Sequence, residues 1–366
     1  MNRAAVLSAA IVVVAALACD SASCAEQQLI RATWLHERWL QTFDESEVNK
    51  LCSVLNTYKI NTVYPRLAFG SKALIPGRSE EGWVPNPDAG RQFIAVLRAR
   101  CPGIRIIPYR GVIKCGEVVD GRRQTLWNTP ALRSSSVNAL WASMDVLGAD
   151  GIQYDLECSD IDDLAVEQGV AGYFAALKAK LGPNKILSVA IPILSQQVTD
   201  YAQPELQILP WTNALLAAPA RDKLGRAPHV YRALFSQSDE VAIMLYDTGV
   251  TEAQGLRFEA LVAAQCWAGA WFSRGYGAKF LPGIRLSVTN SKRYGHYHSV
   301  ENPIRSRRGI GAALSSDLGN GELASSHIHG IAVFRLDVQF EQGWSASAGQ
   351  PYVDELRDWF TDPPGF

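Results

Sequence analysis

The chain has 366 residues, of which 35 are basic and 36 acidic, so its formal net charge is −1 at pH 7. This balance, without a long basic stripe, argues against nucleic acid as a main partner, because nucleic-acid-binding surfaces concentrate Lys and Arg. The length exceeds that of most single domains, but α/β barrels commonly run past about 250 residues as one unit. Because no low-complexity linker or composition break interrupts the chain, we expect one domain.

The first residues have the pattern of a secretory signal. An uncharged apolar run extends from Ala4 to Ala18 after a single basic residue, and small residues follow. The run is shorter than the about 20 apolar residues that a membrane-spanning helix needs, and this pattern is typical of a cleaved signal peptide. With small residues at Ser23 and Ala25, cleavage would release a chain that begins at Glu26. We therefore expect residues 1–25 to be removed, the protein to be exported (periplasmic or extracellular), and the mature chain to have no transmembrane span.

A lipid anchor on Cys19 is the alternative for this segment. Leu17, Ala18 and Cys19 loosely resemble a lipobox. The leucine lies one position closer to the cysteine than a good lipobox requires, which favours signal-peptide cleavage.

Short β-branched or apolar runs alternate with longer helix-like stretches along the remaining chain. The predicted strands are Ile30–Leu35, Thr62–Leu67, Ile104–Tyr109, Gly151–Leu156, Ile186–Ile193, Glu240–Tyr246, Phe280–Leu286 and Gly330–Leu336. The predicted helices are Ser46–Tyr58, Asp88–Arg100, Pro130–Leu147, Val166–Leu181, Ala253–Ser273, Ile304–Leu318 and Tyr352–Phe360, with shorter apolar helical pieces around Ala214 and Tyr231.

Strands that alternate with helices predict parallel βαβ units, and eight such units close naturally into a barrel. We therefore predict an α/β fold, a (β/α)8 TIM barrel that occupies residues 26–366 as a single domain. An open, doubly wound sheet is the alternative, although no GxGxxG motif follows the first strand, as a dinucleotide-binding fold of that kind would require.

The fourth predicted strand carries an unusual set of polar residues. Side chains alternate between the two faces of a strand. The apolar set suits the surrounding helices: Ile152, Tyr154 and Leu156. The polar set then faces the barrel axis: Gln153, Asp155 and Glu157, with Glu157 outermost at the carboxyl-terminal tip. An adjacent Asp and Glu push each other's pKa values apart, which leaves one carboxyl protonated and able to donate to a leaving-group oxygen.

Two further strands are predicted to bring side chains to the same mouth of the barrel. On the sixth, Ala242, Met244 and Tyr246 share one face, and Tyr246 and Asp247 end the strand. The eighth delivers Phe334, followed by Arg335 and Asp337, which would form either part of a sugar platform with a salt bridge or an internal pair that locks the barrel.

We expect no metal site in this set, because no His or third carboxylate lies nearby in sequence on the face of Asp155 and Glu157. The acidic run Asp160, Asp162 and Asp163 could ligate calcium, but its position favours capping of the next helix.

Five cysteines lie beyond the signal: Cys52, Cys101, Cys115, Cys158 and Cys266. An exported protein can keep disulfides. Two of these cysteines follow neighbouring predicted strands and two lie in or just after consecutive helices, so we expect bridges Cys115–Cys158 and Cys52–Cys101, with Cys266 free. Five buried thiols are the alternative.

Together these residues resemble glycoside hydrolase family 18, the chitinases and endo-β-N-acetylglucosaminidases. The family's fourth-strand motif DxxDxDxE is matched by Asp150, Asp155 and Glu157, with Gln153 in place of the second Asp. The sixth-strand motif MxYD is matched by Met244, Tyr246 and Asp247.

The seventh and eighth strands match the family pattern in part, and the third does not. The seventh strand, KFLPGIR with Lys279 and Gly283, is similar to KxxxGxP but lacks the proline. In the eighth, Phe334 stands where the family has a Trp under the sugar. The third strand departs from the family, since PYRGV replaces SxGG.

The resemblance implies a role for each matching residue. Glu157 would be the general acid/base, and Asp155 would orient the substrate's N-acetyl group, whose carbonyl oxygen attacks the anomeric carbon in a substrate-assisted, retaining hydrolysis. Tyr246 would hydrogen-bond the acetamido group and Asp247 a sugar hydroxyl. The remaining substrate contacts are expected from Gln153, Phe334, Met244 and Asp150. No cofactor is implied, and we expect a monomer whose partner is a carbohydrate.

Gln153 is the main departure from the family. Gln153 can hydrogen-bond Asp155 but cannot share a proton with it, so we expect an altered pH profile or reduced turnover. A non-catalytic, lectin-like carbohydrate-binding protein on the same barrel is therefore an alternative. A glycosidase of another barrel family, with its nucleophile on a different strand, and a structural envelope protein are further alternatives.

Overall fold

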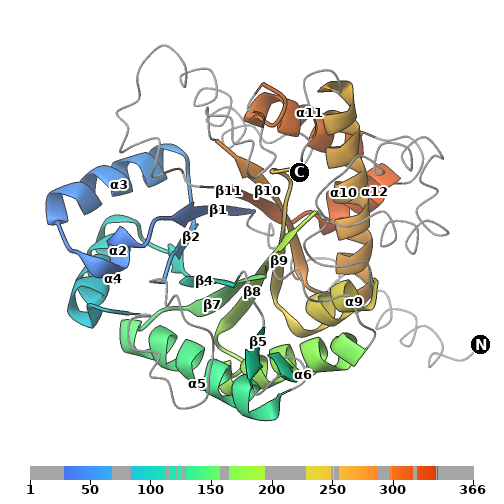
Figure 1. The fold of residues 1–366 in the computed structure, drawn as a ribbon. Helices are drawn as coiled ribbons and strands as arrows, with labels where there is room; N and C mark the ends of the chain where they lie inside the picture. The colour runs from blue at the N-terminus through green and yellow to red at the C-terminus, as the bar shows by residue number, and fades with distance from the viewer. Residues whose placement is uncertain are drawn as a thin grey trace, which may run out of the picture.

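The computed structural model of the chain describes residues 29–67, 84–112, 116–119, 122–125, 129–156, 165–193, 228–248, 250, 255–286, 297, 299–315, 320–334 and 336. Within these residues a sheet of parallel strands forms the centre of the molecule and helices surround it (Figure 1). The predicted signal peptide and the predicted helix Tyr352–Phe360 lie outside the described residues.

The strands of the central sheet agree with the eight predicted ones to within a few residues. They are β1 (Ile30–Leu35), β2 (Thr62–Pro65), β3 (Arg105–Ile106), β4 (Tyr109–Val112), β7 (Gly151–Leu156), β8 (Ile186–Pro192), β9 (Glu240–Met244), β10 (Lys279–Arg285) and β11 (Gly330–Phe334). Their order across the sheet is β3-β2-β1-β11-β10-β9-β8-β7-β4, and every neighbouring pair is parallel.

The two ends of this sheet, β3 and β4, belong to one predicted strand, interrupted only at Ile107 and Pro108. The backbone N–H of Ile107 donates to the carbonyl of Val63 next to it on β2, at 2.9 Å. On the other side the carbonyl of Pro108 accepts from the N–H of Gln153 on β7, at 2.8 Å. The third strand thus pairs with both neighbours and closes the sheet, which confirms the predicted (β/α)8 barrel.

The helices follow the strands in the order that βαβ units require. They are α2 (Arg38–Gln41), α3 (Glu45–Thr57), α4 (Pro87–Arg100), α5 (Pro130–Leu147), α6 (Ala165–Leu181), α9 (Pro228–Gln237), α10 (Gly255–Tyr276), α11 (Pro303–Leu314) and α12 (Asn320–His327). A short antiparallel hairpin of β5 (Gly116–Val119) and β6 (Arg122–Thr125) follows β4. The sequence analysis did not predict α2, α12 or the hairpin.

Local sequence determines where several helices begin. The side chains of Asp44, Asn86 and Asn302 each accept a hydrogen bond from the backbone N–H three residues later, at the starts of α3, α4 and α11. These contacts satisfy N–H groups that have no partner inside the helix. A proline in the first turn of α4, α5 and α11 reinforces the same starts, because its fixed φ suits a helix and its missing N–H is not needed there.

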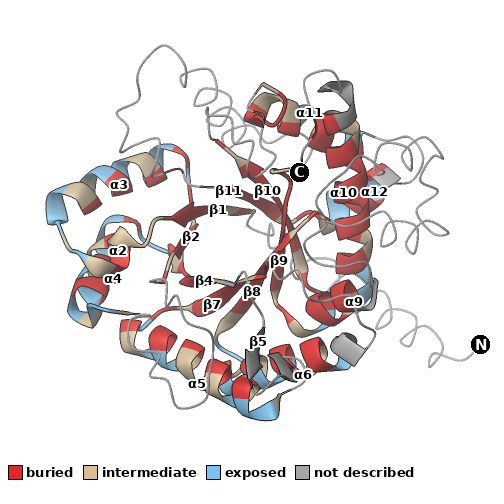
Figure 2. Ribbon diagram, in the orientation of Figure 1, coloured by how far each residue is buried: buried red, intermediate tan, exposed pale blue. Residues whose placement is uncertain are grey.

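The strands of the sheet are mostly buried, whereas the helices also carry exposed residues (Figure 2). The buried apolar side chains form two cores. One fills the barrel, and its buried members are Ile30, Ala32, Trp34, Tyr64, Ile107, Tyr109, Ala190, Ala242, Leu281 and Ala332. The other, larger core lies between the strands and the helices and contains Ile152, Tyr154 and Leu156. Tyr154 makes edge-on contacts with Tyr173 and Phe174 of α6, at ring-centroid distances of 5.5 and 5.6 Å. The face of β7 predicted to meet the helices is therefore confirmed.

Cys52 and Cys101 are buried neighbours at the contact of α3 with the end of α4. The Sγ atom of Cys101 lies 4.0 Å from the backbone oxygen of Cys52. Both are free thiols, which corrects the predicted disulfide: apolar packing, and not a bond, joins the two helices here. Cys266 is a buried free thiol, as predicted, and burial raises its pKa. Cys115 and Cys158 lie outside the described residues.

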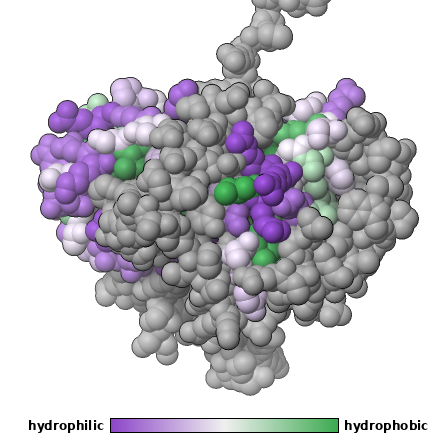
Figure 3. Space-filling view, turned by 90° about the horizontal axis from the view of Figure 1, so that it is seen from above, coloured by the Kyte–Doolittle hydropathy of each residue, from purple (hydrophilic) through white to green (hydrophobic). Residues whose placement is uncertain are grey.

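The described part of the outer surface is polar where α3 lies, on the left of Figure 3. The exposed residues of this helix are Glu45, Ser46, Lys50, Ser53, Asn56 and Thr57. No helix among the described residues has the length and apolar content needed to cross a membrane.

The contact between β1 and β11 leads to a test of the closed barrel. Gly330 pairs with Ile30 and has φ 146°, and a Cβ atom added to it would lie 1.9 Å from the Ile30 oxygen. We expect Gly330→Ala to lower the free energy of unfolding in urea by about 2–4 kcal/mol.

Gly311→Ala is the control. Gly311 lies in α11, and no atom would meet the added Cβ within 4 Å, so this change should be neutral or stabilise the protein by up to about 1 kcal/mol. Equal unfolding free energies for the two variants would contradict the close approach of β1 and β11.

Candidate functional site

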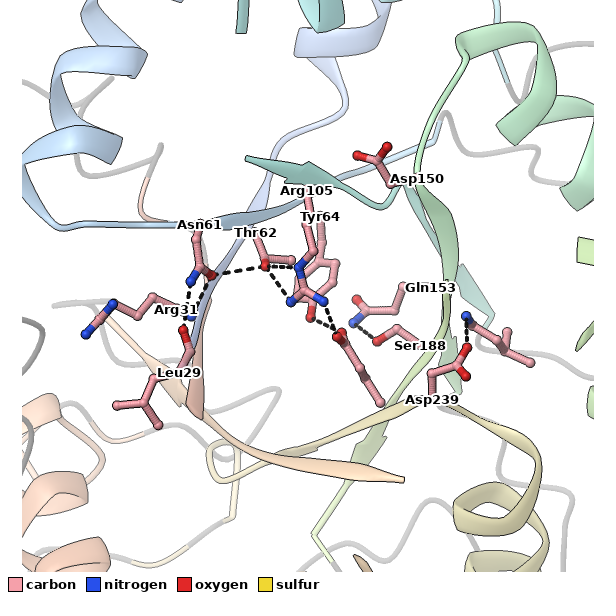
Figure 4. Close-up of polar contacts among 12 residues, drawn as sticks. Leu29, Arg31, Asn61, Thr62, Tyr64, Arg105, Asp150, Gln153, Ser188 and Asp239 are labelled. Atoms are coloured by element: carbon pink, nitrogen blue, oxygen red, sulfur yellow. Dashed lines mark hydrogen bonds and ion pairs between the residues drawn. The ribbon is translucent and has the colours of Figure 1, made fainter. Parts of the chain in front are cut away.

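Near the amino ends of the strands, a buried ion pair and its hydrogen-bond partners fill the barrel interior (Figure 4). Arg105 Nη1 lies 2.6 Å from Glu240 Oε1, and the Glu240 side chain is only 2% exposed. Arg105 also donates to Thr62 Oγ1, and the Tyr64 hydroxyl donates to Glu240 Oε2 at 3.3 Å. Burial, and the nearby charge of Glu240, raise the pKa of Tyr64 well above its usual value, so the hydroxyl remains a donor. The barrel is thus a filled core, as expected of this fold.

A second polar layer joins β1, β7 and β8. Trp34 Nε1 donates to Gln153 Oε1 at 2.5 Å, and Gln153 Nε2 donates to Ser188 Oγ at 2.9 Å. Gln153 points into the barrel as predicted but is completely buried. It has no exposed surface in the structure, and its substrate contact stays a prediction. Gln153 thus connects Trp34 of β1 with Ser188 of β8 inside the barrel.

Asp155 is the next residue of β7 on the inward face, and it is partly exposed. It pairs across the sheet with Gly111 of β4. A Cβ atom on Gly111 would lie 3.3 Å from Asp155 Oδ2, closer than most such contacts. The glycine of the PYRGV segment therefore leaves room for this carboxylate.

Aromatic rings form a wall at the carboxyl ends of the strands. Tyr246, just after β9, stacks on Phe334 at the end of β11, with ring centroids 5.3 Å apart and an angle of 28° between the planes. Trp34 contacts the same Phe334 ring at 6.1 Å. Phe334 is partly exposed, whereas Met244 and Tyr246 are 6% and 8% exposed. An apolar ring face held in this way is the kind of surface on which the C–H face of a sugar stacks.

Asp247 forms an ion pair at the same end of the barrel. Its Oδ1 atom lies 2.6 Å from Nη1 of Arg285, the last residue of β10. The guanidinium carbon of Arg285 lies 5.5 Å from the centre of the Phe334 ring. Tyr246, Asp247, Arg285 and Phe334 are therefore brought together by β9, β10 and β11, as the sequence analysis predicted for all of them except Arg285.

Asp150 lies at the opposite end of the barrel. Its Oδ1 atom pairs with Arg98 Nη2 at 2.7 Å, and its Oδ2 atom accepts from the N–H of Ile106 at 2.8 Å. These contacts tie α4 and β3 to the amino end of β7. Asp150 thus has structural contacts at the amino end of β7, away from the carboxyl ends where this fold carries its sites, and its substrate contact stays a prediction.

Several predicted site residues lie outside the described residues. Glu157 follows directly after Leu156, the last residue of β7, and lies outside the described residues. So do Arg335 and Asp337, and the acidic residues Asp160, Asp162 and Asp163. In the part of the chain that the structure describes, no group of three or more His, Cys, Asp or Glu side chains could hold a metal ion.

Sequence comparison identifies no relative: no family model matches the chain, and no curated protein matches it. Comparison of the structure does find similar proteins. The C-terminal domain of a protein named as a chitinase from Desulfitobacterium hafniense superimposes with a TM-score of 0.51, at 13% identity, over 91% of this chain and 99% of that one. A family 18 chitinase mutant from Cycas revoluta, solved with (GlcNAc)4, gives a TM-score of 0.50 at 13% identity, over 92% and 99% of the two chains.

At such low identity the likeness shows the fold alone. The chain has a barrel like that of the glycoside hydrolase family 18 chitinases, which confirms the fold that the resemblance implied.

The Trp34–Gln153 contact gives a testable consequence. Replacing Trp34 with Phe keeps most of the ring but leaves the buried Gln153 oxygen without its donor, which should lower the free energy of unfolding by about 1–3 kcal/mol. In a Gln153→Leu background the same Trp34→Phe change should cost less, because no acceptor is left unsatisfied. Urea denaturation of the four proteins measures this coupling, and an equal cost in both backgrounds would show that the hydrogen bond is unimportant.

Proposed function

We propose that this protein is a glycoside hydrolase that acts on glycans containing N-acetylhexosamine. The observation that carries the proposal is the arrangement of Asp155, Tyr246, Asp247 and Phe334 at the carboxyl ends of β7, β9 and β11. A family 18-like barrel has its active site on that face, and the similar chitinase from Cycas revoluta was solved with a GlcNAc oligomer. The likeness in fold therefore supports a sugar site, and the side chains support its chemistry.

In the proposed reaction Glu157 protonates the glycosidic oxygen as the leaving group departs. The carbonyl oxygen of the substrate's own acetamido group, oriented by Asp155, attacks the anomeric carbon. Glu157 then takes a proton from the water that opens the resulting ring, and the two displacements together retain the anomeric configuration. The alternation that places Gln153 inward would place Glu157 inward as well, one residue beyond the end of β7.

The other side chains would bind the sugar. Tyr246 would donate to the acetamido group, Asp247 would accept from a sugar hydroxyl, and the partly exposed ring of Phe334 would lie under the sugar. Met244 would add apolar contact from below.

The general-acid role predicts a specific loss. Glu157→Gln should lower kcat/KM for chitooligosaccharides by about 10²–10⁴-fold, because proton transfer is lost while the shape of the side chain is kept. Glu322→Gln, an exposed change on α12, is the matched control and should retain activity. Product release should be followed by mass spectrometry on chitooligosaccharides, peptidoglycan fragments and N-glycans. Equal product from wild type and Glu157→Gln would refute the assignment.

A lectin-like carbohydrate-binding protein is the second candidate, and Gln153 favours it. In place of a proton-sharing Asp, the chain has an amide whose two ends contact Trp34 and Ser188. Glycan binding that persists in Glu157→Gln, with no turnover by the wild type on any substrate, would support this candidate. Release of reducing sugar would exclude it.

We also propose that the protein is exported as a monomer after removal of residues 1–25. The apolar run Ala4–Ala18 and the small residues Ser23 and Ala25 support this cleavage. An N-terminus at Glu26 in the protein recovered from an exporting host is the expected result. A lipid-modified N-terminus at Cys19 would contradict it.

A further inference from the structure

Glu301 is a buried carboxylate that lies against the segment carrying Asp247. Glu301 is 1% exposed. One of its oxygens accepts from the backbone N–H of Asp247 at 2.8 Å, and the other accepts from the N–H of Thr248 at 2.8 Å and from the Thr248 hydroxyl. Through these three hydrogen bonds a single side chain connects to both Asp247 and Thr248.

The backbone at Asp247 has an uncommon conformation. Its φ is 58°, in the left-handed region that residues with a side chain seldom adopt. A conformation of this kind persists only where surrounding contacts fix it, and it is often found at functional sites. Here it accompanies the ion pair of Asp247 with Arg285.

The backbone of Glu301 is itself held by a hydrogen bond to a nearby residue. The N–H of Glu301 donates to the carbonyl of Tyr297 at 2.8 Å, and the next residue, Asn302, caps the start of α11. The residues just before α11 are thus connected to the Asp247–Thr248 segment through the side chain of Glu301.

We propose that Glu301 is a positioning residue for the sugar site. It holds the Tyr246–Asp247–Thr248 segment so that Asp247 meets Arg285 and Tyr246 lies on Phe334, which assembles the polar and aromatic sides of the site. The proposal rests on the proposed function for the role of Asp247 as a sugar ligand. Neither Glu301 nor Arg285 belongs to the residues that the family resemblance identified.

A double-mutant cycle separates positioning from a general structural role. Glu301→Gln keeps the size of the side chain but loses the charge, and turns an NH2 group toward at least one N–H donor. We expect it to raise KM for chitotetraose about 10-fold, the equivalent of one charged hydrogen bond, with kcat changed less than about twofold. Asp247→Ala should raise KM similarly, and the double variant should lose less than the sum of the two single losses, because Glu301 acts partly through Asp247.

A milder variant and a control variant distinguish loss of the Glu301 contacts from general misfolding. Thr248→Val removes only the hydroxyl contact and should raise KM about 2–3-fold. Glu259→Gln changes a carboxylate of α10 that lies 3.7 Å from Arg308, and it should leave KM unchanged. Amide hydrogen exchange at Asp247 and Thr248 should accelerate in Glu301→Gln and stay normal in Glu259→Gln.

The outcomes are distinct for the two proposals. If the wild type binds chitotetraose without cleaving it, the same cycle is run on Kd, and the hydrolase proposal fails while the positioning proposal is judged on the shift in Kd. Additive losses in the double variant, or faster exchange without a change in KM or Kd, would overturn the positioning role. So would unchanged exchange at Asp247 and Thr248 in Glu301→Gln, even if the wild type bound no sugar.

Discussion

The third strand hydrogen-bonds to β2 on one side and to β7 on the other, and this closure determines where the side chains of the candidate site lie. Through Ile107 and Pro108 the backbone continues the pairing that β3 and β4 make separately. In a closed parallel barrel all strands end at one mouth. Residues that are far apart in sequence, such as Asp155 and Phe334, therefore end at the same face without any long connection between them.

Side chains fill the interior of the barrel on the amino side of that mouth. The Arg105–Glu240 pair lies near the amino ends of the strands, and Trp34, Gln153 and Ser188 form a hydrogen-bonded layer above it. Removing one partner of a buried ion pair is costly, so these layers also help to hold the strands in register. Gln153, which stands where the motif that the sequence resembles has its second Asp, is part of that layer.

Much of the architecture could be predicted because a period of two is easy to read in buried strands. It placed Tyr154 against α6 and Gln153 in the barrel, and both placements are confirmed. The same rule would have revealed Arg285, a charged residue on the inward face of an apolar strand, in the position where the family has proline. The hairpin after β4 was missed although the sequence Asp120-Gly121 favours a two-residue turn. Glu301 has no such signal, because its role depends on a contact with a residue 54 positions away.

We propose that a sugar binds at the carboxyl ends of β7, β9 and β11. A crystal structure of the protein soaked with an N-acetylglucosamine oligomer tests it most directly. We predict a sugar ring over Phe334, with its acetamido group near Tyr246 and Asp155 and a hydroxyl at Asp247. An oligomer bound elsewhere on the protein, or an empty mouth at saturating ligand, would contradict the claim.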